Sequence, residues 1–170
     1  MFQKLFQTDN DYTLAVLRVV LGIVFFAHGA QKALGWFGGP GFNGTINFFQ
    51  QIGIPAPLAV LAIAAEFLGG LGLLVGFLAR VAALGIIINM VVAIFMVHSQ
   101  VGFFMNWAGN QKGEGFEFHL LAIGVGLAVL VKGAGALSID RLLAHRTPPV
   151  TADSGRVAQS RESGRRASRI

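Results

Sequence analysis

Four long apolar segments, separated by stretches rich in glycine and polar residues, dominate the hydrophobic pattern of this chain. They cover about residues 13–34, 56–78, 81–98 and 115–131. Each segment is apolar on all sides and lacks the polar face that recurs every 3.6 residues on a soluble surface helix. Because crossing the hydrocarbon core of a bilayer takes about 20 apolar residues, the pattern predicts an all-α fold, a four-helix transmembrane bundle.

The composition changes at the C-terminal end of the chain. From about residue 145 onward, prolines are followed by a stretch rich in Ser, Gly and Arg, which is typical of disorder. We therefore expect one membrane domain over residues 1–145 and a disordered basic cytoplasmic tail over residues 146–170.

Overall composition excludes several classes of function. Hydrophobic residues make up 54% of the chain and charged residues only 12%, whereas a soluble domain carries about 25% charged residues. Cysteine is absent, which excludes disulfides and thiolate chemistry. The positive charge is concentrated near the C-terminus, where it favours contact with anionic membrane lipid, and no nucleic-acid-binding motif is present.

The distribution of Lys and Arg predicts the orientation of the chain. Eight of the 13 lie from Lys132 onward, and the two long loops, at about 35–54 and 99–114, contain only Lys112 between them. The other basic residues expected on the tail side are Lys4, Arg18 and Arg80. Because cytoplasmic segments carry the excess of Lys and Arg, we expect a multi-pass protein with both termini cytoplasmic.

Glu66 is the residue that most needs an explanation, because it lies in the middle of the second apolar segment. A carboxylate there costs roughly 2.5–3.5 kcal/mol on insertion, so it must face protein, a cation or water. Counting 1.5 Å per residue from the basic edges places Glu66, Glu117, His28 and Lys32 at similar heights in the outer half of the membrane. The ionisable residues in or beside the apolar segments are Arg18, His28, Lys32, Glu66, Arg80, His98, Glu117 and His119.

Three interpretations of these groups stay open. In the first, Glu66 and Glu117 form structural ion pairs with Lys32, Arg18 or Arg80. In the second, the groups line a pocket that opens outward and binds a quinone-like or other small polar ligand, or relays protons. The candidates for ligand binding or proton relay are Arg18, His28, Lys32, Glu66, Glu117 and His119.

The third interpretation is a metal site made by His28, His98, Glu117 and His119, which are ligand types that suit Zn, Cu or Fe. Their spacing matches no known signature. On a regular helix, Glu117 and His119 would point about 200° apart. Nucleophilic catalysis has no support, since the chain has no Cys, no Gly-x-Ser-x-Gly and no phosphate-binding loop.

Two further patterns concern helix packing. Residues 18–22 resemble residues 80–85, and Glu66-Phe67 resembles Glu117-Phe118, which predicts two parallel helix-pair repeats. Small residues recur at 65, 69, 72 and 76 and form a seam that permits close helix contact. That seam could act within the bundle or between copies in a homo-oligomer.

Several of these elements together resemble the DoxX family of bacterial membrane proteins over about residues 13–143. The elements, in the family's order, are Leu17-Arg18-Val19-Val20-Leu21-Gly22, Phe26-Ala27-His28-Gly29-Ala30-Gln31-Lys32, Glu66-Phe67-Leu68-Gly69-Gly70, Gly76-Phe77-Leu78-Ala79-Arg80, Glu117 and Gly133-Ala134-Gly135-Ala136-Leu137-Ser138-Ile139-Asp140. The resemblance implies a four-helix protein of the bacterial inner membrane. It also marks Arg18, His28, Lys32, Glu66 and Glu117 as functional candidates.

The resemblance further implies a link to electron transfer. The related DoxD proteins belong to a thiosulfate:quinone oxidoreductase or terminal quinol oxidase, and some DoxX members act with partners in oxidative-stress defence. We therefore expect a small membrane subunit of a quinone-linked respiratory or redox assembly, with other redox subunits as partners. The alternatives are a stand-alone thiosulfate:quinone-type oxidoreductase, a transporter and a structural assembly factor. The sequence has no haem or flavin motif, so a partner or a bound quinone would carry the electrons.

Overall fold

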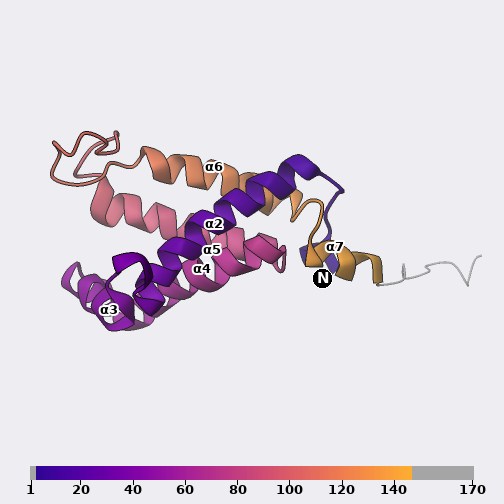
Figure 1. The fold of residues 1–170 in the computed structure, drawn as a ribbon, viewed down its shortest axis with the longest axis horizontal. Helices are drawn as coiled ribbons and strands as arrows, with labels where there is room; N and C mark the ends of the chain where they lie inside the picture. The colour runs from indigo at the N-terminus through magenta and orange to yellow at the C-terminus, as the bar shows by residue number, and fades with distance from the viewer. Residues whose placement is uncertain (1–2, 147–170) are drawn as a thin grey trace, which may run out of the picture.

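A computed structural model describes residues 3–146 of the chain, and this part is helical with no strands. The long helices run roughly along the long axis of the molecule (Figure 1). The elements in chain order are α1 (Gln3–Phe6), α2 (Tyr12–Leu34), the 3₁₀ turn η1 (Trp36–Gly38), α3 (Gly41–Gln51), α4 (Ala56–Val75), α5 (Ala79–Ala93), the π-helical turn η2 (Ile94–His98), α6 (Glu117–Lys132) and α7 (Ile139–Arg146). The predicted tail, 146–170, lies almost wholly outside the described residues.

The prediction of an all-α four-helix bundle is confirmed. Three of the helices, Tyr12–Leu34, Ala56–Val75 and Ala79–His98, are long and apolar enough to cross a membrane. The fourth, α6, has 16 residues and rises roughly 24 Å, so the fourth crossing stays a prediction. The long helices form a closed ring in which α2 packs on α4, α4 on α5, α5 on α6 and α6 on α2.

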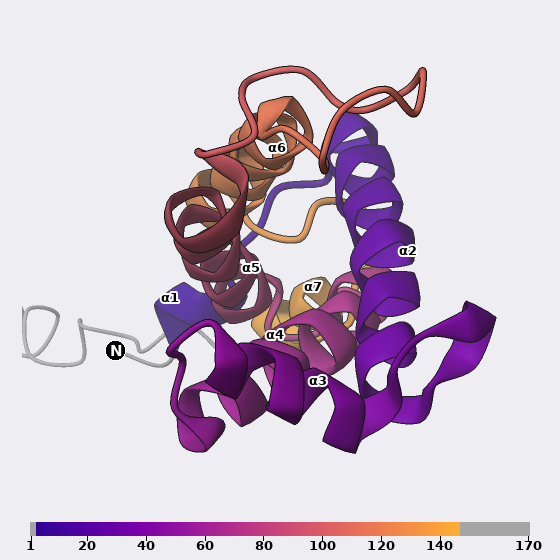
Figure 2. The ribbon, with the colours of Figure 1, turned by 90° about the vertical axis from the view of Figure 1, so that its left-hand side faces the viewer.

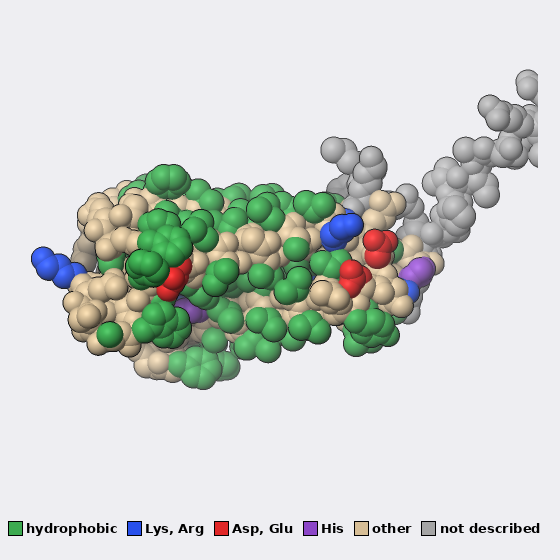
Figure 3. Space-filling model, turned by 90° about the horizontal axis from the view of Figure 1, so that it is seen from above, with side chains coloured by type: hydrophobic (Ala, Val, Ile, Leu, Met, Phe, Trp, Pro, Cys, Tyr) green, Lys and Arg blue, Asp and Glu red, His purple; other side chains and the backbone are tan. Residues whose placement is uncertain are grey.

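Apolar side chains cover the middle of the face seen in Figure 3, and charged side chains gather mainly toward its two ends. Many large apolar side chains on the outside of the bundle are more than one-third exposed, among them Val20, Ile23 and Leu121. In a soluble protein, exposed apolar surface on this scale would be a liability. In a bilayer it is the surface that contacts lipid.

Glycine brings α2 and α4 into direct backbone contact. A Cβ added at Gly29 would lie 2.4 Å from the backbone of Phe67, and one added at Gly70 would lie 2.4 Å from the backbone nitrogen of Phe26. The predicted seam at 65, 69, 72 and 76 lies elsewhere: Gly69 meets Ala82 of α5 at ordinary contact distance. The closest helix contact therefore uses a different set of glycines from the predicted one.

Two connections differ from expectation. The second and third apolar segments, 56–78 and 81–98, leave residues 79–80 for the turn between them, but the turn lies at 76–78. Gly76 (φ 69°) and Leu78 (φ 50°) adopt left-handed backbone conformations there and end α4. The loop after α2 contains the helix α3, which packs against α2 and α4 at one end of the bundle (Figure 2). At the opposite end, α1 packs against α7, so both ends of the described chain lie there (Figure 1).

The predicted repeat has a counterpart in the contacts of two arginines. Arg18, near the start of α2, donates to the carbonyls of Leu73 and Leu74 in the last turn of α4. Arg80, at the start of α5, donates to the carbonyls of Leu130 and Val131 in the last turn of α6. Each arginine thus binds the negative C-terminal end of the neighbouring antiparallel helix.

Candidate functional site

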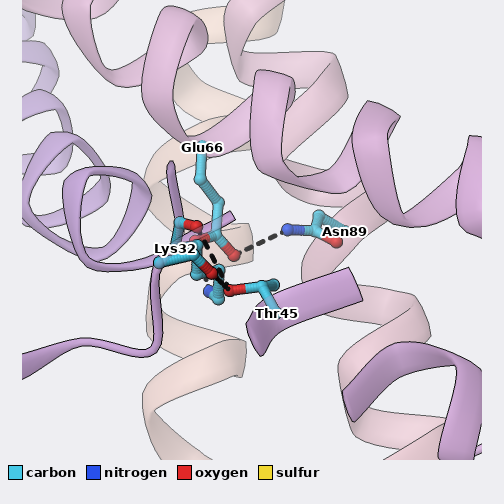
Figure 4. Close-up of polar contacts among 5 residues, drawn as sticks. Lys32, Thr45, Glu66 and Asn89 are labelled. Atoms are coloured by element: carbon cyan, nitrogen blue, oxygen red, sulfur yellow. Dashed lines mark hydrogen bonds and ion pairs between the residues drawn. The ribbon is translucent and has the colours of Figure 1, made fainter. Parts of the chain in front are cut away.

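A charged cluster links three helices near the α3 end of the bundle. Glu66 of α4 is 2% exposed, and its Oε2 forms an ion pair with Lys32 Nζ from the last turn of α2 (Figure 4). Its other oxygen, Oε1, accepts a 2.7 Å hydrogen bond from Asn89 Nδ2 of α5. Both carboxylate oxygens are therefore satisfied by side chains from neighbouring helices, as a charge in a membrane requires.

The backbone around Lys32 is held by α3. The Oγ1 of Thr45, which is 2% exposed, lies 3.2 Å from the carbonyl of Lys32 and 2.8 Å from that of Gly41. These contacts tie α3 to the end of α2 (Figure 4). The close approach of α2 and α4 at Gly29 brings the Lys32 side chain within reach of Glu66.

Beside this cluster lies a cavity of about 1310 Å³. Its walls come mainly from α4 and α5, and Phe48 and Phe49 of α3 and Met105 of the loop before α6 also line it. Most lining residues are apolar. The polar or ionisable members of the lining are His28, Lys32, Glu66, Asn89, His98, Glu114 and His119.

Three histidines contribute to the polar lining. The rings of His98 and His119 lie 4.1 Å apart between centroids and are tilted by 44°. His98 Nδ1 lies 2.7 Å from the carbonyl oxygen of Glu114, and a carbonyl can only accept, so this nitrogen carries a proton. His28 lies near Phe25 and Phe118, with centroid distances of 6.5 and 6.2 Å.

Glu117, the second predicted carboxylate, is not among the residues that line the cavity. Its Oε1 accepts hydrogen bonds from the backbone nitrogen of Met105 at 2.9 Å and from Trp107 Nε1 at 3.4 Å. It therefore holds the loop that precedes α6. The height estimate placed the two carboxylates at a similar level but could not determine where each side chain points.

Arg18 lies near the opposite end of the bundle from Glu66. It is 1% exposed, and within the described part of the chain its guanidinium donates only to backbone carbonyls, with Nε to Ala134 at 2.7 Å. The remaining acceptors are Leu73, Leu74, Ala136 and Leu137. Its contacts are thus those of a structural residue that joins α4 to the segment between α6 and α7.

The Gly133–Asp140 segment lies at the same end of the bundle as Arg18 and contacts it. Asp140, 1% exposed, accepts from the backbone nitrogens of Leu78 at 2.7 Å and Ala79 at 2.9 Å and so caps the start of α5. Burial raises the pKa of the Asp140 carboxyl, against the two backbone donors and the nearby Arg18, which lower it. The motif therefore fixes the turn between α4 and α5.

The predicted metal site has no matching cluster of ligands among the described residues. In residues 3–146, no three His, Asp or Glu side chains gather closely enough to hold an ion. His98 and His119 are neighbours, but Glu117 is bonded to the loop. The polar lining combines the Lys32–Glu66 ion pair and the Asn89 amide with three histidines and Glu114, so it offers both donors and acceptors of hydrogen bonds.

Comparison with known proteins assigns the chain to a family. The DoxX family model matches residues 13–99, and the chain belongs to the DoxX family. It is 33% identical over 134 residues to the inner membrane protein YqjF of Escherichia coli, covering 79% of this chain and 94% of the relative.

Two further relatives are similarly close. The Bacillus subtilis protein CatD, whose name gives it as a proposed oxidoreductase, is 32% identical over 125 residues, which cover 74% of this chain and 82% of CatD. An uncharacterised membrane protein of Mycobacterium tuberculosis is 32% identical over 149 residues, covering 84% of this chain and 88% of the relative. No solved structure matches the chain. The protein is therefore a bacterial membrane protein of the DoxX family.

Two residues in or beside the cluster, Asn89 and Thr45, were not predicted from the sequence. Asn89 is an amide within the third apolar segment, and its position opposite Glu66 could have been suspected because a mid-membrane amide needs a partner. Thr45 carried no such signal, since it lies in a segment that was expected to be a loop and is instead α3.

Proposed function

We propose that this protein is a small membrane subunit of a redox assembly and that its cavity binds a neutral amphiphile of the quinone class. The observation that carries the proposal is the charge-compensated cluster of Lys32, Glu66 and Asn89 beside a large, mainly apolar cavity. The fold supplies a polar end for a ring and apolar walls for a tail.

The charge of the cluster favours a neutral head group. Lys32 already forms an ion pair with Glu66, so the pair contributes no net charge to the cavity. An anionic head, such as a fatty-acid carboxylate or a lipid phosphate, would have to break this pair or remain uncompensated, which is costly at low dielectric. A ring with carbonyl or hydroxyl oxygens needs only hydrogen bonds, which the histidines of the lining can provide.

The walls of the cavity favour an apolar tail. Leu61 and Leu68 of α4 face the same space as Val81 and Ile88 of α5. The volume of about 1310 Å³ exceeds the roughly 300–1,000 Å³ of most small-molecule pockets. A ring and part of an isoprenoid chain fit this shape better than a compact polar metabolite.

The link to electron transfer rests on the family. A quinone supplies two-electron, two-proton redox chemistry within the membrane, and CatD carries a name that proposes oxidoreductase activity. The sequence of the present chain has no haem or flavin motif. Electrons would therefore pass between the bound quinone and a partner subunit, while this chain binds and orients the ring.

Ligand binding is tested by titrating decylubiquinone and a short-chain menaquinone into the protein in lipid nanodiscs. The wild type should bind one of them saturably. Glu66→Gln, which keeps the side-chain shape but removes the charge that holds Lys32, should weaken binding about tenfold. Glu117→Gln is the matched control and should bind normally, because Glu117 does not line the cavity. Absence of saturable binding, or equal losses in both variants, would overturn the proposal.

The subunit role is tested by affinity purification from native membranes in mild detergent, with mass spectrometry of the retained chains. Stoichiometric recovery of a redox protein is the expected result. Recovery of a single chain that reduces quinone with thiosulfate by itself would replace the subunit role with a stand-alone oxidoreductase.

A further inference from the structure

His119 is a buried titratable residue whose role the fold does not explain. It is 6% exposed, and its Nδ1 is enclosed with no hydrogen-bond partner among the residues that the structure describes. A buried polar group left without a partner costs about 1–3 kcal/mol. Leucine or phenylalanine would fill this position without that cost, so a histidine here indicates a use for the other ring nitrogen, Nε2.

The position of His119 indicates where that ligand lies. His119 is one of the residues that line the cavity, and the ring of His98 lies beside its ring at a centroid distance of 4.1 Å. His98 is itself fixed, because its Nδ1–H donates to the carbonyl of Glu114. Phe118, with a ring centroid 5.7 Å away, packs beside it. The imidazole is therefore held in place next to open space.

The enclosed nitrogen also determines what the ring can offer. A proton on Nδ1 would have no acceptor within the described residues, so the neutral ring is better satisfied with its proton on Nε2. A neutral imidazole of this tautomer donates one hydrogen bond through Nε2–H. The natural acceptor in a cavity for a neutral, mainly apolar ligand is a carbonyl oxygen.

We propose that His119 is the head-group contact of the cavity and donates a hydrogen bond to a ring carbonyl of the bound amphiphile, with His98 as its positioning residue. This inference rests on the proposed function, since it names the atom that a quinone would meet. It places the ring between α6 and the Lys32–Glu66 pair, with the tail along α4 and α5.

The test is the infrared spectrum of decylubiquinone labelled with ¹³C at its ring carbonyls, recorded bound to the protein in nanodiscs. A donated hydrogen bond shifts one carbonyl band to lower frequency. His119→Leu should remove that shift and weaken binding about tenfold, and His119→Gln, whose amide can also donate, should restore part of both. His145→Leu, an exposed histidine at the other end of the bundle, is the control and should change neither.

Each outcome decides between the two proposals. If the wild type binds no quinone, the proposed function itself fails. If the wild type binds and His119→Leu keeps both the shifted band and the affinity, the assignment of His119 is overturned while the proposed function stands. Loss of the shifted band in His28→Leu alone would move the contact to His28. The thermal midpoint of ligand-free His119→Leu should equal or exceed that of the wild type, and a lower midpoint would show that His119 is needed for the fold.

Discussion

The Lys32–Glu66 pair makes an asymmetric prediction about stability. Glu66 has a side chain that is 3% exposed, whereas that of Lys32 is 27% exposed. Lys32→Met leaves an enclosed carboxylate with only the Asn89 amide as a donor, which should cost about 3–5 kcal/mol of unfolding free energy. Glu66→Leu leaves an ammonium that can reach water, so its cost should be smaller, about 1–2 kcal/mol after allowance for solvent screening.

The double variant Lys32→Met/Glu66→Leu removes both charges together. Replacing a buried ion pair by apolar side chains is often close to neutral, so we expect a loss of no more than about 1 kcal/mol. The two single losses would sum to roughly 4–7 kcal/mol, and subtracting the loss in the double variant gives a coupling free energy of roughly 3–7 kcal/mol. Coupling of this size requires direct contact between the two groups.

The assay is reversible unfolding in mixed micelles with increasing SDS, followed by helical circular dichroism. Lys132→Met, which removes an exposed lysine at the far end of α6, is the matched control and should change stability by less than about 0.5 kcal/mol. Additive losses in the double variant would refute the reasoning. Glu66 would then be compensated by another group, and the argument for a neutral ligand would lose its basis.

Three other predictions follow from the packing of the bundle. Arg18→Met should destabilise the protein by at least about 3 kcal/mol in the same assay, because five backbone carbonyls lose their charged donor; a loss below 1 kcal/mol would contradict this. Gly29→Ala should cost about 1–3 kcal/mol because its Cβ would overlap the α4 backbone, whereas Gly124→Ala, with no atom within 4 Å, should be neutral or stabilising. Asp140→Asn should lower the thermal midpoint, since an amide replaces one of two acceptor oxygens at the start of α5, by an amount equivalent to about 1 kcal/mol.

The helices could be predicted from the sequence because their signal is strong. Long apolar runs interrupted by glycine and proline fixed α2 and α4 to within a few residues, since only a helix satisfies its own backbone in lipid. The π-helical end of the third span and the helix α3 were missed. The helix α3 has no apolar run long enough to stand out, and the π-helical turn lies inside the predicted span 81–98, where the apolar pattern does not distinguish π from α geometry.

The side-chain contacts of the site were harder to predict from the sequence. Lys32 was among the partners considered for Glu66, because both lie at a similar height, and the structure pairs them. The sequence could not show which way the side chains of Arg18 and Glu117 point. A helix that is apolar on all sides has no recurring polar face from which its orientation could be inferred. Their partners include backbone carbonyls and loop backbone amides, and every residue type has such groups, so the sequence does not identify them.

The most direct test of the central claim is the mass of what the protein retains from its own membrane. The wild type and Ala62→Phe, which fills the cavity one turn from Glu66, would be released from native membranes in mild detergent and examined by native mass spectrometry. Leu71→Phe, on the same helix but outside the cavity lining, is the control. We predict that the wild type and Leu71→Phe carry an added mass equal to one isoprenoid quinone and that Ala62→Phe does not. The same quinone on all three proteins, or none on the wild type, would contradict the account.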